Sequence, residues 1–99
     1  MVLQKVIGNF VRACSITHVA IKFEGVIYSL PAPNRHHHVM REIVRLRPEV
    51  SNIDNDVQGF LDETGRFLDR EEALIAAIAS GQIKAPRFQP NELFSEDLW

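Results

Sequence analysis

The chain has 99 residues, which is enough for one modest hydrophobic core and too few for two. Apolar residues make up 45% and charged residues 24%, as in ordinary globular proteins, and no apolar run approaches the roughly 18 residues of a membrane-spanning helix. A formal net charge of −2 argues against a nucleic-acid coat or a polybasic membrane binder. The single cysteine, Cys14, cannot form an internal disulfide. We therefore expect one soluble domain over residues 1–99, in a reducing cytoplasm, with neither a membrane nor nucleic acid as partner.

Residues 1–14 are ambiguous. Gly8-Asn9 is typical of a turn between two short strands, but the apolar residues also recur at helical spacing. Two arrangements stay open: a segment packed on the domain, with a helix slightly favoured, or an N-terminal extension frayed away from it. The apolar residues at helical spacing are Leu3, Val6, Ile7, Phe10 and Cys14.

Two apolar runs, residues 16–23 and 26–30, predict a first β-hairpin. They flank Glu24-Gly25, a pair suited to a two-residue turn in which glycine supplies a positive φ. The pairing that follows from this turn puts apolar or aromatic residues opposite each other on one face. The pairs are Phe23 with Val26, Ile21 with Tyr28, and Val19 with Leu30.

A sharp turn on Pro31 and Pro33 then leads into a helix. Proline cannot continue a strand ladder, and it disfavours helical dihedrals in the preceding residue, so Asn34 is the expected N-cap. The helix runs to Arg47-Pro48, and the polar residues 51–56 that follow are expected to form a loop. Its apolar face is predicted from three- and four-residue spacing: Val39, Met40, Ile43, Val44 and Leu46.

Residues 59–68 predict a second hairpin, with the turn at Asp62-Glu63-Thr64-Gly65. Asp69 and Glu72 form a capping box for a helix from Arg70 to Ser80, which Gly81 ends. The last residues are too apolar for a disordered tail, so we expect the segment 82–99 to dock on the domain.

These elements predict an α+β fold: a single compact domain with two β-hairpins, two main helices and a docked C-terminal segment. The predicted core residues are Val19, Ile21, Phe23, Tyr28, Leu30, Ile43, Phe60, Phe67, Leu74 and Ile78.

Short motifs are spread over residues 16–99: Tyr28-Ser29-Leu30-Pro31, Arg35-His36-His37, Gly59-Phe60, Gly65-Arg66-Phe67, Arg70-Glu71-Glu72-Ala73, Gly81-Gln82 and Ser95-Glu96-Asp97-Leu98-Trp99. Together they resemble small uncharacterised proteins encoded by bacteriophages and prophages. The resemblance implies a phage source and the bacterial cytoplasm as the place of work. Phage proteins of this size often act by binding, for example by inhibiting host defence or sequestering a signal nucleotide.

The start of the first helix is the strongest candidate site. Helix-end N–H groups, a guanidinium and imidazoles that protonate near pH 6.5 together suit a phosphate. Three consecutive histidines diverge around a helix and lack the i, i+4 spacing of helical zinc sites, so we expect no metal and no cofactor. The alternative is internal: carboxylates of the C-terminal segment neutralise the same cluster. The candidate binding residues are Arg35, His36, His37, Arg70, Gln82, Ser95, Glu96 and Asp97.

The predicted function is a phage-encoded binding or inhibitory protein that recognises a phosphate-bearing ligand, such as a nucleotide, or a host protein. The alternative is a small nucleotide- or phosphoryl-processing enzyme in which His36 or His37 acts as acid or base. No P-loop, nucleophile elbow or dinucleotide fingerprint supplies a reaction class, so enzyme and binder both stay open. Homo-oligomerisation stays open as well.

Overall fold

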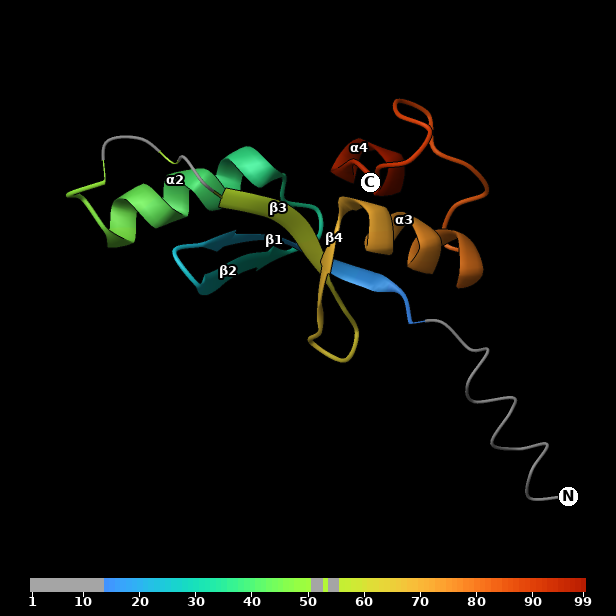
Figure 1. Ribbon diagram of the computed structural model, residues 1–99, viewed down its shortest axis with the longest axis horizontal. Helices are drawn as coiled ribbons and strands as arrows, with labels where there is room; N and C mark the ends of the chain where they lie inside the picture. Colours follow the sequence, from blue (N-terminus) through green and yellow to red (C-terminus); the bar gives the residue numbers. More distant parts are fainter. Residues whose placement is uncertain (1–13, 51–52, 54–55) are drawn as a thin grey trace, which may run out of the picture.

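The computed structural model describes residues 14–50, 53 and 56–99. It opens with a hairpin of β1 (Ile16–Phe23) and β2 (Val26–Pro31), shown in Figure 1. Glu24 and Gly25 have φ angles of 52° and 78°, so both residues of the turn lie in the left-handed region that a tight hairpin requires. The three predicted pairs, from Phe23 with Val26 to Val19 with Leu30, are confirmed. The expectations for residues 1–13 lie outside the described residues.

The second hairpin is also confirmed, and it joins the first in one antiparallel sheet of order β2-β1-β3-β4. β3 (Asp56–Asp62) pairs with both β1 and the short β4 (Phe67–Asp69). β3 begins three residues before the predicted strand, so Asp56 belongs to the sheet and not to the expected loop. The reason is non-local, because Asp56 lies opposite Phe23 at the end of β1. The other loop residues, 51, 52, 54 and 55, are not among those described.

Two helices cover one face of this sheet (Figure 1). α2 (His36–Leu46) packs on β1 and β2, and α3 (Arg70–Ala79) packs on β3, β4 and β1. The capping box of α3 is confirmed: Asp69 Oδ1 accepts the N–H of Glu72, and the Glu72 carboxylate accepts the N–H of Asp69. Gly81, at φ 80°, follows the C-terminus of this helix as expected.

The predicted N-cap of α2 is wrong by one residue. Asn34 closes the proline turn instead, where its Nδ2 donates to the Pro31 carbonyl over 2.7 Å. Arg35 is the N-cap, and its backbone N–H donates to Nδ1 of His38 over 2.8 Å. Because the Asn34 side chain bonds within the proline turn, it does not cap the helix. Nδ1 of His38, three residues after the N-cap, is the hydrogen-bond acceptor instead, as the Glu72 carboxylate is in α3.

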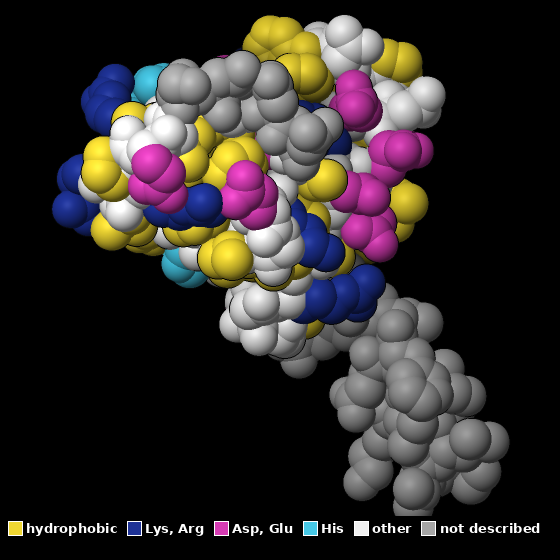
Figure 2. Space-filling model, turned by 60° about the vertical axis from the view of Figure 1, so that its left-hand side comes forward, with side chains coloured by type: hydrophobic (Ala, Val, Ile, Leu, Met, Phe, Trp, Pro, Cys, Tyr) yellow, Lys and Arg dark blue, Asp and Glu magenta, His cyan; other side chains and the backbone are white. Residues whose placement is uncertain are grey.

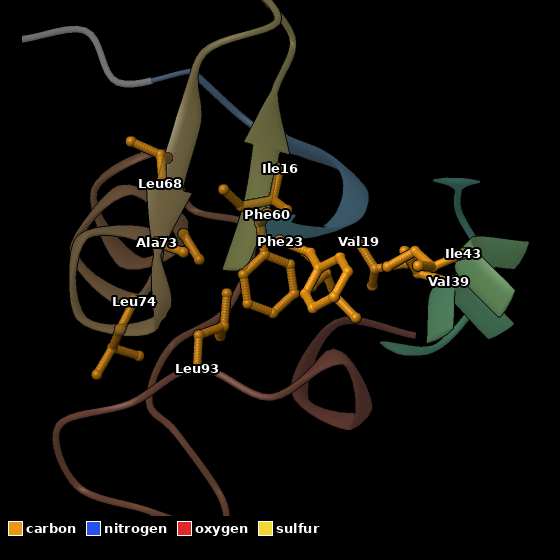
Figure 3. Close-up of a cluster of buried hydrophobic side chains, with 12 residues drawn as sticks. Ile16, Val19, Phe23, Val39, Ile43, Phe60, Leu68, Ala73, Leu74 and Leu93 are labelled. Carbon is orange, nitrogen blue, oxygen red and sulfur yellow. The ribbon is translucent and has the colours of Figure 1, made fainter. Parts of the chain in front are cut away.

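The core lies between the sheet and the two helices, with Phe60 at its centre (Figure 3). Six predicted core residues are buried, namely Val19, Ile21, Phe23, Ile43, Phe60 and Leu74, and Tyr28 and Leu30 are partly buried against them. The core also contains residues outside the predicted core set, among them Val39 of the predicted apolar helix face: Ile16, Val39, Leu68, Ala73, Ala77 and Leu93.

Phe67 and Ile78 are the two wrong core predictions. β4 pairs Leu68 with Phe60, so Leu68 faces the helices and Phe67 takes the opposite face of the sheet, where it is half-buried. Its ring lies over Gly59, where a Cβ would come within 2.7 Å of Phe67 Cζ and 2.2 Å of the Leu68 carbonyl oxygen. Ile78 is exposed on the outer side of α3.

The predicted docking of the C-terminal segment is confirmed. Leu93 is fully buried, and its N–H donates to the carbonyl of Arg70 at the start of α3. The segment then forms the short helix α4 (Ser95–Leu98) and ends at Trp99, whose Nε1–H donates to the Asn34 carbonyl over 2.9 Å. The C-terminus is therefore tied to the residues before α2 and to the start of α3 (Figure 1).

Candidate functional site

The docked C-terminal segment reaches the N-terminal end of α2. Nη1 of Arg35 donates to Oγ of Ser95 over 3.2 Å, and the Ser95 hydroxyl donates to a Glu96 oxygen over 3.3 Å. Ser95 is buried and bridges the guanidinium and the carboxylate. Three of the candidate residues, Arg35, Ser95 and Glu96, are thus brought together although about 60 positions separate them in the sequence.

His36 points inward. It is 8% exposed, its Nε2–H donates to the Gly59 carbonyl over 2.7 Å, and its ring lies edge-on to Phe60 at 5.0 Å between centroids. Burial, and to a smaller extent the positive charge of Arg70, lowers the pKa of His36 below its ordinary value. The Gly59 hydrogen bond and the charge of Glu96 act in the opposite direction without reversing the shift. His36 is therefore a neutral, hydrogen-bonded side chain that joins α2 to β3.

The lowered pKa of His36 predicts an acid-sensitive fold. The unfolded chain binds the His36 proton at its ordinary pKa of about 6.5, above the folded pKa, so stability is full above that value and falls as pH drops towards the folded pKa. We expect the melting temperature to fall as the pH drops below about 6.5. Glu96→Gln, which removes a charge that raises the pKa, should lower the His36 imidazole midpoint in an NMR titration.

His36→Asn is the matched variant for this prediction, because it lacks the titrating ring. Its melting temperature should be lower overall and should depend less on pH in the same range. A His36 midpoint above 6.5 in the unmodified protein would contradict the prediction.

The outward side of the α2 start is basic. His37 and Arg41 are exposed, and the rings of His37 and His38 lie 4.0 Å apart between centroids. Slight desolvation, followed by the nearby charges of His37, Arg41 and Arg35, lowers the pKa of His38. We call Arg35, His37, His38 and Arg41 the basic cluster. Dark blue and cyan side chains lie side by side at the top left of Figure 2.

No acidic residue in the first turn of α2 offsets this charge, in contrast to α3 and α4. The first turn of α3 carries Glu71 and Glu72, and that of α4 carries Glu96 and Asp97. Arg41 and His38 were not among the predicted site residues. The i, i+4 spacing of His37 and Arg41 could have indicated that they share a helix face.

Arg70 and Gln82 are engaged elsewhere. Arg70 donates to the Leu93 carbonyl and to Oε1 of Gln58, each over 2.6 Å, and its guanidinium lies 4.4 Å from the centre of the Phe94 ring. It therefore joins the sheet, α3 and the C-terminal segment. Gln82 bonds both backbone polar groups of Ile16, accepting over 2.7 Å and donating over 2.9 Å, so its amide clamps the start of β1.

The pocket beside Arg70 has the wrong charge for phosphate. Its volume is about 390 Å³, and four carboxylates line it together with this one guanidinium. The carboxylates are those of Asp56, Asp69, Glu71 and Glu92. A phosphate is therefore better suited to the basic cluster than to this pocket.

Asp97 holds the C-terminal segment in shape. Its Oδ2 accepts the N–H of Phe94 over 3.0 Å, and its Oδ1 accepts the N–H of Arg87 over 2.8 Å.

Among residues 14–50, 53 and 56–99, no three histidine, cysteine, aspartate or glutamate side chains lie close enough together to hold a metal ion. No helix in the described part of the chain is long and apolar enough to cross a membrane.

The fold and these contacts define the class of the protein: a small two-layer α+β protein whose C-terminal segment links the starts of its two main helices. A family model described as phage T4 y16D protein matches residues 15–99, so the chain belongs to that family of phage proteins. Comparisons with curated proteins and with solved structures found no match. The expected phage origin is thereby confirmed at the level of the family, whereas the particular motif pattern stays a prediction.

Proposed function

We propose that this phage protein acts by binding a phosphate-bearing ligand, such as a nucleotide, at the basic cluster. The observation that carries the proposal is the grouping of Arg35, His37, His38 and Arg41 around a helix start without acidic first-turn residues. Their mutual repulsion and the positive end of α2 both favour an oxyanion over an empty site. Binding of this kind in the bacterial cytoplasm would withhold the ligand from the host, including host defence.

Several contacts favour a binder over the enzyme alternative. His36 uses Nε2 to hold the Gly59 carbonyl and is buried, so this nitrogen is not free to exchange a proton with a substrate. Nδ1 of His38 accepts the N–H of Arg35 and is likewise engaged. The exposed His37 and Arg41 have the charge and access that an oxyanion needs, and Arg35 already holds a hydroxyl oxygen, that of Ser95.

The test is calorimetric titration with inorganic phosphate and a panel of mono-, di- and cyclic nucleotides. Arg41→Gln should weaken binding about tenfold, the loss expected for one charge-assisted contact. The control is Arg45→Gln on the same helix, because Arg45 already pairs with Glu42. That variant should bind as the unmodified chain does.

The same titration repeated at several pH values adds a second criterion. Affinity should rise as the pH falls, because each imidazole of the basic cluster that gains a proton adds a positive charge. If phosphate and every nucleotide fail to bind, or if Arg41→Gln and Arg45→Gln bind alike, the basic cluster is not a phosphate site. Product formation that survives Arg41→Gln would favour an enzyme.

A further inference from the structure

The outer side of α3 is unusually apolar for a surface. Ile75 is 69% exposed, and Ile78, one turn further on, is also exposed. A pocket of about 400 Å³ lies between this side of α3 and β4. Its apolar lining comes from Cys14, Leu68, Ile75, Ala76 and Ala79, which we call the α3 groove.

A helix that is apolar all round is normally covered on all sides. The inner side of α3, with Ala73, Leu74 and Ala77, is buried on the sheet. After its first turn, which carries Glu71 and Glu72, the outer side also carries isoleucine and alanine where a surface helix would carry charge. Within the described part of the chain, β4 is an edge strand of the sheet. The described residues thus leave an apolar surface that another segment can bury.

The position of Cys14 points to a segment of the same chain. Cys14 is the first described residue and itself lines the α3 groove, so residues 1–13 join the domain at the groove. As a helix these residues would span about 20 Å, compared with about 15 Å for the ten residues of α3. Residues 1–13 also contain apolar side chains at helical spacing: Leu3, Val6, Ile7 and Phe10.

Charge agrees with this assignment. Residues 1–13 contain Lys5 and Arg12 and no acidic residue. The charged residues that line the α3 groove are Asp62, Glu72 and Arg66, which leave one net negative charge. We propose that residues 1–13 bind in the α3 groove of their own chain, with their apolar side chains against Ile75, and thereby cover the outer side of α3. This inference is independent of the phosphate site, which lies at the start of α2.

The experiment uses the full chain. Amide hydrogen exchange should show protection in residues 3–11, and Ile75→Asp should remove that protection while the strands of the sheet stay protected. Phe10→Asp should lower the melting temperature, and combining it with Ile75→Asp should lower it little further, because both variants disrupt the same contact. The milder Ile75→Ala should shift both readouts in the same direction by less.

The matched control is Ile27→Asp, an exposed isoleucine on the sheet face that does not pack on the helices. It should leave the protection of residues 3–11 unchanged. The inference is overturned if these residues exchange freely in the unmodified chain, or if Ile75→Asp leaves their protection intact. Protection that rises with protein concentration would place the segment on a second copy and would also overturn it. Phosphate affinity should be the same in all these variants, so the two proposals fail separately.

Discussion

Phe60→Ala is expected to lower the free energy of unfolding by about 3–5 kcal/mol, the usual loss for a large aromatic ring removed from a core. Phe60 is 0% exposed and lies at the centre of the buried cluster, between residues of α2 and α3 (Figure 3). Its ring also supports the buried His36 edge-on. The cavity left by the variant would therefore loosen both helices, and urea denaturation measures the loss.

The chain offers two matched controls for this prediction. Phe88 is 57% exposed, so Phe88→Ala should change stability by no more than about 0.5 kcal/mol. Phe67 is half-buried on the other face of the sheet, so Phe67→Ala should cost less than Phe60→Ala. If Phe67→Ala is the more damaging of the two, the inner face of the second hairpin has been assigned incorrectly.

Deletion of residues 95–99 is expected to cost about 2–4 kcal/mol, from the lost burial of Leu98 and Trp99 and the lost hydrogen bonds. The deletion removes Ser95 from Arg35 and Trp99 from the Asn34 carbonyl, so it detaches the segment from the start of α2. Denaturant unfolding of both chains measures the difference. Hydrogen exchange should show the first turn of α2 opening more readily than the sheet.

Trp99→Phe tests the hydrogen bond of Trp99 apart from most of the burial of its ring. It keeps a six-membered aromatic ring in place and removes the Nε1–H that bonds Asn34 together with the rest of the five-membered ring, so it should cost about 0.5–1.5 kcal/mol. A deletion that leaves both the unfolding midpoint and the exchange at the α2 start unchanged would show that the C-terminal segment does not support the helix.

The sequence by itself determined the elements that short-range contacts define. The turn at Glu24-Gly25 requires two left-handed residues, and only neighbouring strands are needed to form it. Asp69 and Glu72 bond each other's backbone across three residues, so the start of α3 is visible in the local sequence. The α+β class, both hairpins and both main helices follow from such signals.

Only the tertiary structure decided which side chains meet. The local alternation of residues is compatible with either Phe67 or Leu68 on the inner face of the sheet. Leu68 lies on that face because β4 pairs it with Phe60. His36 looks like a surface histidine at a helix start, but the Gly59 carbonyl, 23 positions away, holds it inside. Among the candidate site residues, Arg35 meets Ser95, whereas Arg70 and Gln82 bind other partners. Which side chains are buried and which partners they bond therefore depends on contacts between segments that are distant in the sequence. Such contacts form only when the whole chain packs, so neighbouring residues in the sequence do not predict them.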